Sequence, residues 1–109
     1  MDFETYQKLS RRTAIYPDKD SNFTYPALGL AGETGEVIEK VKKLIRDKAS
    51  NIDDEFRREV KKEMGDVLWY LAQLATELKI SLNEVAEENI DKLMSRMERR
   101  KISGNGDNR

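Results

Sequence analysis

The sequence predicts an all-α protein whose helices form a four-helix bundle. Apolar residues and charged residues each make up 38% of the chain, a balance typical of helices with one buried and one solvated face. With only 2 Pro and 6 Gly in 109 residues, the chain has few of the turns that join short strands. This length suits one small domain, which excludes an enzyme with a cleft between two lobes.

Composition also excludes several kinds of chemistry. The chain has no Cys and no His, so disulfides, Cys or His zinc sites, thiol nucleophiles and His-dependent triads are impossible. The net charge of -1 does not favour a nucleic-acid partner. The longest early stretch without charge, residues 21–32, is too short and too polar for a membrane span or a signal peptide. We therefore expect a cytoplasmic protein with no nucleic-acid or membrane partner.

The first half of the chain predicts two helices. Apolar residues recur at helical spacing over residues 2–15, and Pro17 ends that segment. A second amphipathic segment covers residues 26–46, with Pro26 at the first helical position that proline favours. The region between them is expected to be a loop.

The second half predicts two more helices with recognisable starts. Asp53 supplies a cap and N-terminal negative charge for a long apolar repeat that reaches Leu78. Ser81 and Glu84 have the spacing of a capping box, and the helix that they begin extends to about Lys101.

We expect residues 1–102 to form one domain and residues 103–109, rich in Gly and Asn, to form a flexible tail. Four helices of this size bury a limited core, and apolar residues extend beyond it. The pattern therefore predicts a homo-oligomer, either a dimer or a tetramer, with part of its interface at Trp69, Tyr70, Met94 and Met97.

Two acidic pairs border the apolar faces of the second and third predicted helices. Glu33 and Glu36 form one pair and Glu63 and Asp66 the other, each with three-residue spacing that places both members on one side of a helix. Such pairs are common on solvated faces, but Glu63 falls within the apolar face. Carboxylates that converge in a partly buried space need a cation. The pairs therefore predict a site for Mg²⁺, or alternatively Mn²⁺, and phosphate chemistry.

The last predicted helix carries a polar stripe beside its apolar face. Asn89, Lys92 and Arg96 follow one another at helical spacing, so an amide, an ammonium and a guanidinium line up. These groups suit anionic oxygens, although Lys and Arg in such positions often extend from a core edge into water.

Three segments together resemble the MazG-like nucleoside triphosphate pyrophosphohydrolases of the all-α NTP pyrophosphatase superfamily. They are YPALGLAGETGE at residues 25–36, KEMGDVLWYL at 62–71, and ENIDKL at 88–93 followed by Arg96. The family signature is Glu-x-x-Glu followed, after a variable connection, by Glu-x-x-Asp, and both parts are intact here. The resemblance covers nearly the whole chain.

The resemblance implies hydrolysis of an NTP or dNTP to the monophosphate and pyrophosphate. By the same resemblance Glu33, Glu36, Glu63 and Asp66 would bind Mg²⁺, with Glu36 and Glu63 as catalytic groups. The substrate would be held by Asn89, Lys92, Arg96 and Trp69, within a site that a second subunit completes. Which carboxylate is the general base, and which base and sugar are preferred, stay open.

Two other functions stay open at this point. A phosphoribosyl-ATP pyrophosphohydrolase-like enzyme would use similar acidic helices, and only substrate profiling separates it from a nucleotide-pool enzyme. A non-catalytic helical interaction module would use the long third helix for partner packing and would tolerate loss of all four carboxylates.

Overall fold

The computed structural model describes residues 1–103, and within that part of the chain it contains four α-helices and no strands. The all-α prediction is therefore confirmed. The helices are α1 (Phe3–Arg11), α2 (Thr24–Lys48), α3 (Asp54–Glu77) and α4 (Leu82–Ser103).

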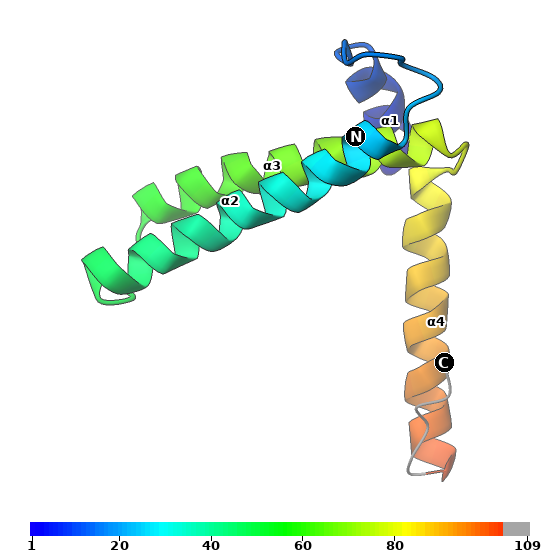
Figure 1. Ribbon diagram of the computed structural model, residues 1–109. Coiled ribbons are helices and arrows are strands. Elements are labelled where there is room, and N and C mark those ends of the chain that lie inside the picture. The colour runs from blue at the N-terminus through cyan, green and yellow to red at the C-terminus, as the bar shows by residue number, and fades with distance from the viewer. Residues whose placement is uncertain (104–109) are drawn as a thin grey trace.

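Helices α2 and α3 form a long antiparallel hairpin, which is the largest feature of the molecule (Figure 1). A short turn joins them, in which Ala49 and Ser50 adopt left-handed φ values of 50° and 62°. Asp53 caps α3 as predicted, because its side chain accepts a hydrogen bond of 2.8 Å from the backbone N–H of Phe56. At the start of α2, Asn22 accepts a 3.0 Å bond from the N–H of Tyr25, a cap that the sequence analysis missed.

Helix α1 packs against the C-terminal part of α3. The contact is centred on Gln73, whose side chain is completely buried. Its Nε2 donates to Oγ of Ser10 at 3.0 Å, and its Oε1 accepts from Nη1 of Arg11 at 3.2 Å. A buried amide with both ends satisfied specifies one arrangement of the two helices.

Helix α1 is shorter than the predicted segment 2–15. After Arg11 the backbone tightens, and the N–H groups of residues 12–14 bond to carbonyls three positions earlier. The Thr13 hydroxyl donates to the carbonyl of Ser10 at 2.7 Å, a local bond that competes with helix continuation. The chain therefore leaves the helix early enough to bury Tyr16.

The loop between α1 and α2 is fastened to the end of α3 by Glu77. Its carboxylate accepts hydrogen bonds from Nη2 of Arg11 at 2.9 Å, from the hydroxyl of Tyr16, and from the backbone N–H groups of Asp20 at 3.1 Å and Asn22 at 3.0 Å. Burial alone would raise the pKa of this carboxyl, but its donors outweigh burial and lower the pKa to about 2. The loop is thus held by a charged group that is almost fully buried.

The start of α4 is tied to α1. The Ser81 hydroxyl accepts a 3.2 Å bond from the N–H of Glu84, as the predicted cap requires. Gln7 accepts a 2.8 Å bond from the N–H of Leu82 and donates a 2.9 Å bond to the carbonyl of Ile80. These bonds fix where α4 begins and in which direction it leaves.

The expected four-helix bundle does not close within one chain. Lys79 adopts a left-handed φ of 58°, the N–H of Ile80 bonds back to Ala75 at 2.8 Å, and Gln7 holds the next turn against α1. Helix α4 consequently runs away from the α2/α3 hairpin (Figure 1). Its apolar stripe is left exposed, with exposed fractions of 57%, 46%, 53% and 50% at Ile90, Leu93, Met94 and Met97.

The C-terminal end of α4 is Ser103, the first residue of the predicted tail. The rest of that tail, residues 104–109, lies outside the described residues. None of the helices in residues 1–103 is both long enough and apolar enough to cross a membrane.

Candidate metal and phosphate site

Three of the four predicted carboxylates meet across the α2/α3 hairpin. One carboxylate oxygen from each of Glu33, Glu63 and Asp66 lies within 4.8 Å of the other two, and we call these three residues the carboxylate cluster. Glu33 and Glu63 are half-buried, whereas Asp66 is exposed. Glu36 lies one turn beyond Glu33 on α2 and is exposed, and its oxygens are outside the group.

The electrostatics of the cluster reflect this crowding. Burial, followed by the charges of Asp66, Glu63 and Glu36, raises the pKa of Glu33 above its ordinary value. Burial and the charge of Asp66 also raise the pKa of the Tyr6 hydroxyl on α1. Negative charge is therefore concentrated at one level of the hairpin, and Glu36 contributes to it although it lies outside the cluster.

The donor set fits a hard divalent cation. Mg²⁺ prefers carboxylate oxygens and commonly uses only a few protein ligands, leaving other positions to water or phosphate oxygens. Three carboxylates at this separation repel one another in the absence of a compensating charge. Glu33, Glu63 and Asp66 are consequently the residues that could hold such an ion.

Next to the cluster, Tyr70 packs directly on Gly29. A Cβ atom built on Gly29 would lie 2.5 Å from Cζ of Tyr70 and closer still to two other ring atoms, so only glycine leaves room for the ring. Gly29 stands one turn before Glu33, and Tyr70 stands one turn after Asp66. This pair was not predicted from the sequence, although both residues lie four positions from an acidic residue of the cluster and so share its side of the helix.

Tyr70 belongs to a row of aromatic rings. It packs edge-on against Trp69 with ring centroids 5.0 Å apart, and it lies tilted against Tyr25 at 6.4 Å. Tyr25 in turn stacks on Tyr16 at 4.9 Å. Trp69, which the sequence analysis placed with the substrate, donates from Nε1 to Oγ1 of Thr13 at 2.8 Å, so one edge of its indole is engaged within the protein.

The predicted polar stripe lies on a different part of the molecule. Asn89 and Lys92 are exposed and Arg96 is partly buried, and all three belong to the helix that leaves the hairpin (Figure 1). A single chain therefore does not bring this stripe to the carboxylate cluster.

Comparison with known proteins matches residues 23–101 to the model of the MazG nucleotide pyrophosphohydrolase domain. The chain belongs to the MazG family. The match extends over α2, α3 and most of α4 and includes every predicted site residue, whereas α1 lies before it. The family resemblance found in the sequence is thereby confirmed.

A close relative of this MazG protein is the Gene 37 protein of Mycobacterium phage L5. The two are 45% identical over 114 aligned positions, and the alignment covers 100% of each. No solved structure matches this MazG chain.

Proposed function

We propose that this MazG protein is a Mg²⁺-dependent nucleoside triphosphate pyrophosphohydrolase that converts an NTP or dNTP to the monophosphate and pyrophosphate. The observation that carries the proposal is the carboxylate cluster, in which oxygens of Glu33, Glu63 and Asp66 lie within 4.8 Å of one another. Glu36, one turn from Glu33, is proposed as a fourth ligand. A cytoplasmic site of action stays a prediction from composition.

When bound to these carboxylates, Mg²⁺ would offset the negative charge of the triphosphate and polarise the phosphate that is attacked. The protein groups then have separate tasks. Glu36 or Glu63 accepts a proton from the attacking water, and the bond between the α-phosphorus and the bridging oxygen breaks. Lys92 and Arg96 bind phosphate oxygens, Asn89 donates its amide to the same oxygens, and Trp69 contacts the nucleoside.

Product analysis tests this proposal most directly. A panel of ribo- and deoxynucleoside triphosphates, with phosphoribosyl-ATP included, is incubated with Mg²⁺ or with a chelator, and the products are identified by phosphorus NMR. We expect a monophosphate and pyrophosphate, formed only with the metal. Orthophosphate and a diphosphate as first products would overturn the reaction, and turnover of phosphoribosyl-ATP alone would favour the related enzyme.

Glu63→Gln tests the carboxylate cluster itself, since it removes one charge at nearly constant volume. We expect this variant to lose metal-dependent hydrolysis. Glu59→Gln is the matched control, because Glu59 lies one turn earlier on α3, outside the carboxylate cluster, and pairs with Lys40 at 3.9 Å. Equal activity of the two variants would contradict the cluster assignment.

We also propose self-association, as a dimer or a tetramer, in which α4 of a second copy brings Asn89, Lys92 and Arg96 to the carboxylate cluster. This is supported by the exposed apolar stripe of α4, since an isolated helix of this length is marginal in water without packing. A 22-residue helix anchored mainly at its first turn needs a further partner.

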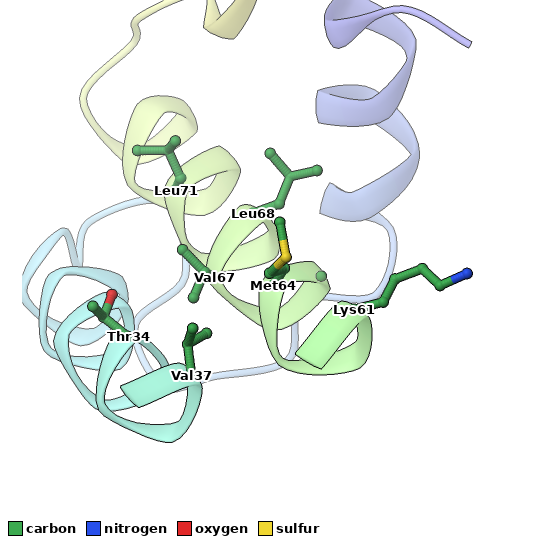
Figure 2. A pocket seen from close by; sticks show the side chains of 8 residues that line it. Thr34, Val37, Lys61, Met64, Val67, Leu68 and Leu71 are labelled. Atoms are coloured by element: carbon green, nitrogen blue, oxygen red, sulfur yellow. The ribbon is translucent and has the colours of Figure 1, made fainter. Parts of the chain in front are cut away.

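The α2/α3 hairpin offers a second apolar surface. A groove of about 620 Å³ opens along it (Figure 2). Its lining comes from both helices of the hairpin, with Lys61 at one edge, and consists of Thr34, Val37, Lys61, Met64, Gly65, Val67, Leu68 and Leu71. A groove lined by apolar side chains of two helices is a surface on which a second copy can pack.

Light scattering at micromolar concentration tests self-association, with a dimer or tetramer as the expected result. Met64→Glu in the groove and Ile90→Glu on α4 should each shift the protein toward monomer, because both introduce a charge into the proposed interfaces. Glu88→Lys, which reverses a charge on the exposed α4, should leave the assembly intact. A strictly monomeric wild-type chain would contradict the proposal.

A further inference from the structure

The separation of α2 and α3 near the carboxylate cluster is set by a contact between a glycine and an aromatic ring. The hairpin is antiparallel, so Gly29 faces Tyr70 at one level while Glu33 meets Asp66 one turn along. With no side chain on Gly29, the Tyr70 ring itself fills the space between the helices.

The ring is held in place from several sides. Trp69 packs edge-on against it and is in turn bonded to Thr13, while Tyr25 lies on another side and stacks on Tyr16. A half-buried ring with neighbours on these sides cannot move aside without disturbing them. On the side of Gly29 the ring leaves no room for a side chain, so it limits how closely α2 and α3 approach at this level.

We propose that Tyr70 is a positioning residue for the metal-binding carboxylates, acting through its ring on Gly29 rather than by binding the ion. This inference rests on the proposed function of the cluster. A change in helix separation at Gly29 passes directly to Glu33, because the two residues are one turn apart on a continuous helix. Three ligands from two helices tolerate little displacement.

The test measures the affinity of the intact chain for Mn²⁺ alone, by calorimetry without nucleotide. Tyr70→Phe keeps the ring and should bind Mn²⁺ within about two-fold of wild type. Tyr70→Ala removes the ring and should weaken binding about ten-fold or more, as loss of an outer support of a metal site commonly does. Equal losses in both variants would show that the hydroxyl is responsible and would overturn the proposal, as would wild-type affinity in Tyr70→Ala.

A core variant at the far end of the same hairpin distinguishes a specific loss of Mn²⁺ affinity from a general loss of stability. Leu44→Ala truncates a buried side chain of α2 and should lower stability while leaving Mn²⁺ affinity unchanged. If Leu44→Ala lost as much affinity as Tyr70→Ala, the effect would be one of stability, and the positioning role would be wrong.

Substitutions of glycines on α2 test the same contact between Gly29 and Tyr70. Gly29→Ala forces the ring away and should also weaken Mn²⁺ binding, whereas Gly32→Ala, whose added methyl group meets no atom within 4 Å, should not. The double variant Gly29→Ala/Tyr70→Leu makes room for the methyl group and should bind more tightly than Gly29→Ala, a non-additive result that only neighbouring residues give. Additive losses would contradict the contact.

The Mn²⁺ affinities also distinguish failure of the proposed function from failure of the proposed role of Tyr70. A wild-type chain that binds no Mn²⁺ would remove the metal site and this inference together. A wild-type chain that binds Mn²⁺ with unchanged affinity in Tyr70→Ala and Gly29→Ala would leave the metal site standing and overturn only the role of Tyr70.

Discussion

Nη2 of Arg11 lies 2.9 Å from Oε2 of Glu77, an ion pair that joins residues 66 positions apart in the sequence. Both side chains are largely removed from solvent, with exposed fractions of 15% and 1%. Breaking a buried pair costs more than breaking one on the surface, because the remaining charge loses its partner away from water. The pair therefore connects α1, the loop after it and the end of α3 into one unit.

This arrangement predicts a loss of stability in acid. The pKa of Glu77 is about 2 in the folded chain, compared with an ordinary value of 4.5. A lowered folded-state pKa means that the unfolded chain binds more protons between these values, so the stabilisation is complete above pH 4.5 and is lost as the pH falls toward 2. The full contribution is about 3 kcal/mol. Urea unfolding between pH 7 and pH 3 should show it.

Glu77→Gln isolates this contribution. The variant should be less stable at neutral pH and should show a shallower loss of stability in acid. Glu4→Gln is the control, since Glu4 forms an exposed ion pair with Lys8 at 3.2 Å, and loss of an exposed pair should cost less than about 0.5 kcal/mol. Parallel pH profiles for wild type and Glu77→Gln would show that Glu77 does not carry the effect.

Metal binding predicts opposite effects of Glu63→Gln in the presence and absence of Mg²⁺. Without metal, removal of one of several crowded negative charges should leave the chain as stable as wild type or more stable. With Mg²⁺ at ten times its dissociation constant, the wild type should gain about 1.4 kcal/mol, whereas the variant should gain almost nothing. Thermal unfolding with Mg²⁺ and with chelator measures both effects, and an equal metal-induced shift in the two proteins would argue against Glu63 as a ligand.

Trp69 is hydrogen-bonded to Thr13 and is also proposed to contact the substrate. Substitution of Trp69 and substitution of Thr13 should therefore have different effects on KM. Trp69→Phe removes both the N–H group and part of the proposed substrate surface, so it should raise KM and cost about 1 kcal/mol of stability. Thr13→Val leaves the indole in place but removes the acceptor of this bond and the hydroxyl that donates to the Ser10 carbonyl, so it should cost at least as much stability with KM unchanged. Equal KM values in all three proteins would remove Trp69 from the substrate site.

The placement of the polar stripe predicts complementation between two inactive chains. Arg96→Ala should weaken catalysis by on the order of 2 to 4 kcal/mol while metal binding survives. If α4 serves the partner's cluster, refolding Arg96→Ala together with Glu63→Gln should restore roughly a quarter of wild-type activity, because half of the dimers then contain one intact site. A mixture without activity would mean that α4 acts on its own chain.

The elements with local signals were predictable from the sequence. Asp53 and Ser81 begin α3 and α4 as their capping positions indicated, since a cap involves only neighbouring residues. Glu63 was expected to be partly buried because it interrupts an apolar face, and it is half-buried in the cluster. Helical periodicity is enough to establish which residues share a face.

Features that depend on distant residues were not predictable in the same way. Glu77 looks like any acidic residue near the end of a helix, and its donors come from residues 11–22. The direction of α4 depends on Gln7 and on the left-handed conformation of Lys79, and neither has a sequence pattern that indicates an angle between helices. For this reason the four predicted helices are present but do not close into a bundle within one chain.

The hydrogen bonds of α1 have a consequence for synthesis of the chain. Gln7 bonds to Thr76, Ile80 and Leu82, so during synthesis the partners of α1 are made 69 to 75 residues after it. The α2/α3 hairpin can start from the short turn between Lys48 and Asp54 and so can form early, whereas docking of α1 must close a loop of more than sixty residues. Until residues 76–82 have been made, α1 lacks these bonds, so the synthesis of that segment determines when α1 becomes packed and shielded from proteases.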